Sequence, residues 1–160
     1  MATLYIRDDA GFREAASEEI LKSAQTLMAR RFRSGSPVLT APNKVRDYLK
    51  LHLGTLDYEL FGVLHLDTRR RLIAVEDLFR GTIDSAAVHP REVVKSALRY
   101  GSSALVLFHN HPASGSSEPS PADEFITRRL KDALALVDVL VLDHLVVGDS
   151  VYSFAQHGLI

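Results

Sequence analysis

The chain has 160 residues, 46% of them hydrophobic, and a formal net charge of −1 at pH 7. That length fits one domain with a single core, and the small charge excludes a strong general attraction to nucleic acid or anionic membranes. The absence of cysteine excludes disulfides, Cys-ligated zinc and a cysteine nucleophile. Residues 1–11 carry no secretory apolar stretch, and no apolar run reaches the roughly 20 residues that span a bilayer. We therefore expect a soluble cytoplasmic protein.

The first third of the chain predicts two helices. The residues before Ser17 have no strong period and fit either disorder or a short edge strand. A helix then begins at Ser17, and apolar residues recur at helical spacing as far as Arg31. Residues 33–37 break this helix, and Asn43 is the expected cap of a second one that ends at Leu53.

The middle of the chain predicts a hairpin followed by a helix. Residues 59–67 read as a buried strand, and residues 71–79 read as its hairpin partner across a charged turn. A third helix opens with Pro90 at its first position and stops before Gly101.

The last third alternates strands with a helix. Residues 104–108 form a short apolar run typical of a strand covered on both faces. A loop rich in Ser, Gly and Pro leads to a fourth helix over residues 121–137. Three short strands are expected to follow, at 139–142, 145–147 and 151–154. Helices between strands predict a mixed α/β sheet with helices packed on it.

A group of potential metal ligands follows the buried strand. His109 and His111 are two residues apart, so in extended backbone both side chains point to the same face. Asp123 lies one turn into the next helix, and the intervening loop is long enough to fold that turn back over the imidazoles. Two histidines and one carboxylate leave a fourth position of tetrahedral zinc open for water, as in catalytic zinc sites.

Simpler interpretations of the same residues remain open. A His-x-His pair is often a coincidence or two satisfied polar side chains. Ser120 and Asp123 also form a variant capping box, with Pro121 favoured at the first helical position. The cap and the metal site are compatible, because a cap would hold Asp123 rigidly.

Residues from about 40 to 160 resemble the RadC-like (UPF0758-type) branch of the JAMM (MPN+) metalloprotease superfamily. The resemblance covers most of the chain and rests on five specific segments: Leu78–Thr82, Val88–Val94, His109–Pro112, Glu118–Ser120 with Asp123, and Asp143–Gly148. We accordingly expect residues 1–38 to be an N-terminal extension with one helix and residues 39–160 to be the RadC-like domain.

The resemblance implies a cytidine-deaminase-like α/β/α fold and a zinc ion at His109, His111 and Asp123. It also implies that Ser120 assists the tetrahedral intermediate and that Glu59 is the catalytic carboxylate. Eleven residues separate His111 from Asp123, one more than the usual arrangement, and a loop absorbs such an insertion cheaply. The segment before residue 40 is too short for the helix-hairpin-helix region of longer RadC proteins, so we expect a short form without it.

These features favour a zinc metallopeptidase or isopeptidase-type amide hydrolase acting on a peptide or protein substrate. The alternative is a DNA-repair-associated or mobile-element accessory domain whose metal is only structural. A zinc nucleobase deaminase is excluded, because it needs a Pro-Cys-x-x-Cys pair. We expect no membrane association and no specific nucleic-acid binding, only salt-sensitive contact through Arg30, Arg31 and Arg33.

Other carboxylates and histidines of the chain are alternatives to the residues assigned to the site. Among the other carboxylates, Glu76, Glu92 and Glu118 compete with Glu59 for the role of base, and the family resemblance, rather than periodicity, selects Glu59. Among the histidines, we expect His144 to have a structural role only.

Overall fold

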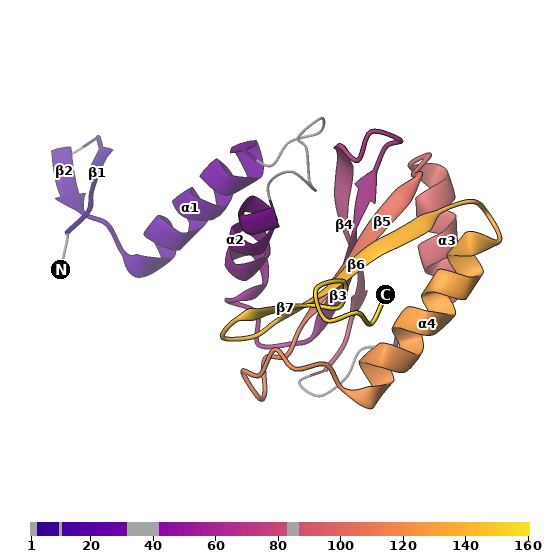
Figure 1. Ribbon diagram of the computed structural model, residues 1–160. Coiled ribbons are helices and arrows are strands. Elements are labelled where there is room, and N and C mark those ends of the chain that lie inside the picture. The colour runs from indigo at the N-terminus through magenta and orange to yellow at the C-terminus, as the bar shows by residue number, and fades with distance from the viewer. Residues whose placement is uncertain (1–2, 10, 32–41, 83–86) are drawn as a thin grey trace.

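A computed structural model describes residues 3–9, 11–31, 42–82 and 87–160 of the chain (Figure 1). Its helices are α1 (Ser17–Arg31), α2 (Pro42–Leu53), α3 (Pro90–Arg99) and α4 (Pro121–Ala135). Its strands are β1 (Tyr5–Asp8), β2 (Gly11–Glu14), β3 (Leu60–Leu66), β4 (Leu72–Arg80), β5 (Ala104–Asn110), β6 (Leu140–Val147) and β7 (Val151–Ser153).

The main sheet has five strands in the order β4-β3-β5-β6-β7. Strands β5 and β6 are parallel, and the other neighbouring pairs are antiparallel. The expected hairpin of β3 and β4 is confirmed. The central strand β5 is buried along its whole length, so whatever follows its end is held by the core of the molecule.

Helices cover both faces of this sheet (Figure 1). On one face, α2 packs through Val45, Leu49 and Leu53 against alternate residues of β3, β5 and β6. On the other face, α3 and α4 pack through a second cluster that includes Val93, Ala97, Leu130 and Leu134. The predicted mixed α/β fold with an α/β/α arrangement is confirmed.

Two strand predictions were wrong in their bounds. Strand β5 continues past the apolar run through His109 and Asn110. Strand β6 is continuous where we expected two strands with a break at Asp143 and His144. Both polar residues fit inside the strand because their side chains are hydrogen-bonded: Asp143 accepts from the His144 and Ala155 backbone N–H groups, and the His144 ring has partners on both nitrogens.

The N-terminal residues form a two-stranded antiparallel hairpin, β1 and β2, followed by α1, which lies against α2 (Figure 1). The large side chains of this N-terminal segment are exposed: Leu4 by 53%, Tyr5 by 63% and Phe12 by 76%.

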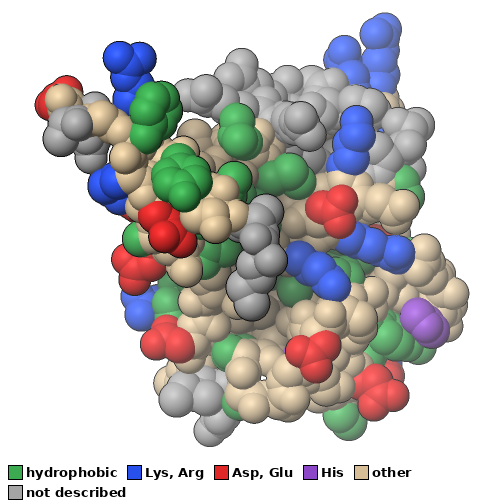
Figure 2. Space-filling view, turned by 90° about the vertical axis from the view of Figure 1, so that its left-hand side faces the viewer, with side chains coloured by type: hydrophobic (Ala, Val, Ile, Leu, Met, Phe, Trp, Pro, Cys, Tyr) green, Lys and Arg blue, Asp and Glu red, His purple; other side chains and the backbone are tan. Residues whose placement is uncertain are grey.

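Viewed from the side of the N-terminal segment, the surface carries both signs of charge among hydrophobic side chains (Figure 2). The basic side chains of Arg30, Arg31 and Arg33 lie outside the described part. No helix in the described ranges is long and apolar enough to cross a membrane.

The α2 interface should contribute much of the stability of the fold. Leu49→Ala removes a side chain that is fully buried against the sheet, and we expect it to lower the free energy of unfolding by about 2–5 kcal/mol. Leu98→Ala, the same change on a helical residue that is 58% exposed, should cost less than about 1 kcal/mol. Urea denaturation followed by circular dichroism measures both, and equal losses would contradict the assigned core.

Candidate metal centre

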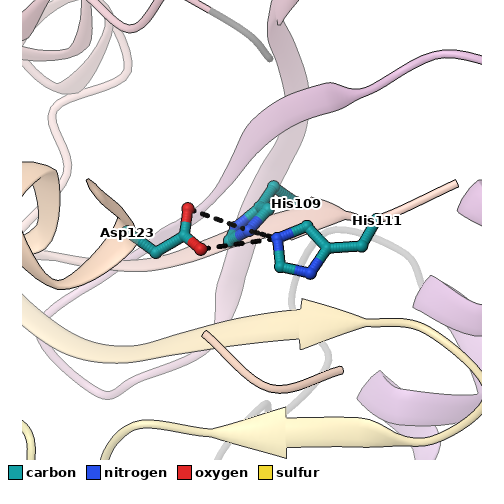
Figure 3. A group of neighbouring side chains, drawn as sticks. All are labelled: His109, His111 and Asp123. Atoms are coloured by element: carbon teal, nitrogen blue, oxygen red, sulfur yellow. Dashed lines mark hydrogen bonds and ion pairs between the residues drawn. The ribbon is translucent and has the colours of Figure 1, made fainter. Parts of the chain in front are cut away.

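Two histidines and one aspartate meet where β5 ends and α4 begins (Figure 3). His109 Nε2 lies 2.9 Å from His111 Nε2. Asp123 faces both rings, with Oδ1 3.2 Å from His109 Nε2 and Oδ2 3.4 Å from His111 Nε2. The structure therefore brings together the three residues that the sequence predicts to be metal ligands.

The start of α4 holds Asp123 in place. The Ser120 side chain accepts a hydrogen bond from the Asp123 backbone N–H at 3.2 Å. In return, the backbone N–H and the hydroxyl of Ser120 both donate to Asp123 Oδ2, each at 2.7 Å. This is the reciprocal capping box expected from the sequence. The cap and the candidate ligand are the same carboxylate, so its direction is set by the helix terminus.

The site favours a positive charge. Burial raises the pKa of Asp123, but the adjacent rings of His109 and His111 and the hydrogen bonds from Ser120 outweigh burial and hold that pKa far below its usual range. The hydrogen bond to Asp123 raises the pKa of His111. Two imidazole nitrogens 2.9 Å apart beside a carboxylate can share a proton or a metal ion.

The His111 ring is oriented by the loop that precedes α4. Its Nδ1 lies 3.1 Å from the Ser116 carbonyl oxygen. A carbonyl can only accept, so Nδ1 carries the proton and Nε2 is the atom available for a ligand bond. A groove of about 190 Å³ reaches His111, lined also by Leu53, Asn110 and Gly148. The lining of this groove does not include His109 or Asp123, but the side chains of His111 and Asp123 are partly exposed, by 18% and 13%.

The donor set fits zinc. Zn–N bonds of about 2.0–2.1 Å in a tetrahedron place neighbouring ligand atoms about 3.3 Å apart, and the distances among the three side chains are 2.9, 3.2 and 3.4 Å. Each histidine faces a different oxygen of Asp123, so a shared ion would bind one of them. Imidazole and carboxylate ligands also suit other divalent transition metals; the group can hold a metal, and its chemistry leaves the identity open.

Glu59, the expected catalytic carboxylate, lies immediately before β3. Its charge contributes to the raised pKa of His111. Because Phe61 pairs with His109 in the sheet, Glu59 lies at the same strand ends as His111, and it is not one of the three converging side chains. The buried amide of Asn110 holds the backbone on both sides of Glu59: Oδ1 accepts from the Leu60 N–H at 2.8 Å, and Nδ2 donates to the Tyr58 carbonyl at 3.1 Å. The strand that carries the histidines therefore also positions Glu59.

Glu76, the first rival for the role of base, belongs to a different cluster. Its carboxylate accepts hydrogen bonds from Ser96 and Arg99 and lies 3.4 Å from His65 Nε2. Glu92 accepts a hydrogen bond from Lys95 on the surface of α3. Glu118 remains on the loop, where its backbone N–H donates to Ser116 Oγ.

Sequence analysis gave His144 a structural role but did not show that His144 and Thr127 lie behind His109. His144 Nε2 lies 2.8 Å from His109 Nδ1, and His144 Nδ1 lies 2.7 Å from Thr127 Oγ1. Burial lowers the pKa of His144 well below its usual value. No periodic signal could have found this contact, because it depends on how β6 aligns with β5.

Comparison with known proteins now decides the family. The family model described as a RadC-like JAB domain matches residues 39–159. The chain belongs to this family. The resemblance inferred from the motifs is thereby confirmed.

The RadC-like domain is similar to curated proteins that share the name UPF0758 protein. One from Leptothrix cholodnii is 61% identical over 125 residues, which cover 78% of this chain and 56% of the relative. One from Thioalkalivibrio sulfidiphilus is 60% identical over 122 residues, 76% of this chain and 54% of the relative. One from Vibrio cholerae is 50% identical over 140 residues, 88% of each protein. The chain thus spans about half the length of the first two relatives and most of the third.

Metal analysis tests the ligand set. We expect about one zinc ion per chain after dialysis against zinc, as three convergent ligands imply. The double substitution His109→Ala with His111→Ala should abolish it, while His157→Ala, outside the group, should retain it. Equal zinc content in the wild type and the double variant would contradict the assignment.

Proposed function

We propose that this RadC-like domain is a zinc-dependent amide hydrolase of the metallopeptidase or isopeptidase type, with a peptide or protein substrate. One observation carries the proposal: three ligand side chains converge where His111 and Asp123 are partly exposed, and the charge of a further carboxylate, Glu59, reaches His111 without that residue joining the group. A hydrolytic site needs both parts, since the ligands hold the metal and the base moves the proton.

His109, His111 and Asp123 would hold the zinc ion. When bound, zinc lowers the pKa of a coordinated water to about 7 and polarises the scissile carbonyl. Glu59 accepts the proton that the attacking water loses and returns it to the nitrogen of the leaving amine, which breaks the amide bond. Asn110 fixes the backbone on either side of Glu59 and so orients the carboxylate for both transfers.

Ser120 has two roles in this proposal. Its hydroxyl proton is directed to Asp123 Oδ2 at 2.7 Å, which stabilises the ligand carboxylate. We infer that, with substrate bound, the hydroxyl turns to donate to the oxyanion that develops on the scissile carbonyl, as positioned donors do in other acyl-transfer sites.

The alternative is an accessory domain in which the metal is only structural. Structural zinc sites are usually closed by four protein ligands, whereas catalytic ones keep a position open. Only three such ligands meet among the described residues. Glu59 separates the two functions experimentally, because a structural site would need it either as a fourth ligand or not at all.

Glu59→Gln keeps the size and hydrogen-bonding reach of the side chain but cannot accept the proton. We expect it to bind zinc as tightly as the wild type, to melt at a similar temperature and to lose at least about a hundredfold in hydrolysis. A library of peptide and isopeptide substrates at neutral pH provides the assay, and Glu92→Gln, on the surface of α3, is the matched control. Loss of zinc would make Glu59 a ligand, and full activity would remove it as the base.

Ser120→Ala should separate the cap from the chemistry. We expect it to lower the free energy of unfolding by about 1 kcal/mol and to lower turnover per folded molecule by about tenfold or more. Ser120→Thr retains a hydroxyl and should recover most of both. If Ser120→Ala loses stability and keeps the wild-type turnover, Ser120 is a cap only.

A further inference from the structure

A buried chain of hydrogen bonds connects the back of His109 to the backbone of Asp123. His109 Nδ1 lies 2.8 Å from His144 Nε2, His144 Nδ1 lies 2.7 Å from Thr127 Oγ1, and Thr127 Oγ1 lies 2.5 Å from the Asp123 carbonyl oxygen. Three of these residues are almost entirely buried, with exposures of 1% for His109, 0% for His144 and 1% for Thr127. Solvent therefore does not set the proton positions along the chain.

The chemistry of each partner determines the direction of the chain. The Asp123 carbonyl can only accept, so the Thr127 hydroxyl donates its single proton to it. The Thr127 oxygen must then accept from His144, which places a proton on His144 Nδ1. In a neutral imidazole the other nitrogen is an acceptor, so His144 Nε2 accepts from His109 Nδ1. His109 Nε2 is left unprotonated, with a lone pair available for a metal ion that it would share with Asp123, whose Oδ1 lies 3.2 Å away.

The surroundings of His144 support this assignment. Phe61 lies edge-on to its ring, with centroids 5.6 Å apart, and Phe154 lies at 4.8 Å. Neither ring can take a proton, and His109 and Thr127 are the hydrogen-bond partners of the two ring nitrogens. An apolar side chain would fill this space at lower cost if packing were its only role, since buried polar groups are retained only with partners.

We propose that His144 and Thr127 are positioning residues that hold His109 in the tautomer protonated on Nδ1, and thereby set the affinity of the site for a divalent metal. The inference rests on the metal-binding part of the proposed function and not on hydrolysis. The hydrogen-bond chain begins and ends beside the same residue. The Asp123 carbonyl is its last acceptor, and the Asp123 carboxylate lies 3.2 Å from Nε2 of His109, its first ring. His109 and Asp123 are therefore oriented together.

Thr127→Val tests the role of this hydrogen-bond chain, because valine removes the hydroxyl of Thr127 and keeps the shape of the side chain. His144 Nδ1 then loses its acceptor, and the proton is free to move to Nε2, where it forces His109 into the other tautomer. We expect the zinc affinity, measured by competition with a chromophoric chelator, to fall about 10- to 100-fold. Thr127→Ser restores a hydroxyl and should recover an affinity close to that of the wild type.

Thr26, elsewhere in the protein, offers a matched control. Its Oγ1 donates to the Lys22 carbonyl at 2.8 Å in α1, the same helical contact that Thr127 makes to Asp123, but on an exposed surface. Thr26→Val should leave zinc affinity unchanged. An equal loss in Thr26→Val and Thr127→Val would overturn the proposal, as would wild-type affinity in Thr127→Val.

A second measurement needs neither zinc nor activity. Long-range ¹H–¹⁵N spectra of the metal-free wild type read the tautomer of each histidine directly, and we expect protons on Nδ1 of both His109 and His144. Finding His109 unprotonated at Nδ1 would overturn the proposal even if the Thr127 variants fail to fold. If the wild type binds zinc with the expected tautomers but cleaves no substrate, the proposed hydrolysis is wrong and the positioning role of His144 and Thr127 is still supported.

Discussion

The carboxylate of Asp123 is the group on which the candidate site depends, because it connects the first turn of α4 to the end of β5. It receives two hydrogen bonds from Ser120 and faces the rings of His109 and His111. These contacts outweigh the cost of burial and keep it ionised. A fixed negative charge beside two imidazoles makes a cation favourable there, so the helix cap and the candidate metal site share one side chain.

The ligand set could be predicted because each part of it is local in sequence. The period of two in extended backbone places His109 beside His111. The cap residue Ser120 and the following Pro121 mark the start of α4, which fixes where Asp123 lies. The fold class followed similarly from the alternation of apolar strands and amphipathic helices. The predicted end of β5 at Phe108 was wrong because the apolar pattern stops there, whereas the strand continues through the polar residues His109 and Asn110 of the candidate site.

The supporting residues could not be predicted because they depend on register between distant segments. His144 is 35 positions from His109, and Asn110 is 50 positions from Leu60. Asp143 and His144 resembled a break between strands because two polar residues interrupt an apolar run. In the fold His144 is paired with Leu107, which lies two residues before His109 and on the same face. Only the parallel alignment of β5 with β6 reveals that a polar residue there meets a ligand.

The two histidines are held by different kinds of constraint. His109 is oriented by buried side chains, whereas His111 is oriented by the Ser116 carbonyl on a surface loop. That loop packs so closely on the turn after β6 that a Cβ at Gly148 would lie 2.2 Å from the Gly115 carbonyl oxygen. The loop can therefore vary in length only where this contact is kept. The position of the loop sets the orientation of the His111 ring through the Ser116 carbonyl. A change in the loop would therefore act on the partly exposed His111 alone, while the buried His109 keeps its direction through the core.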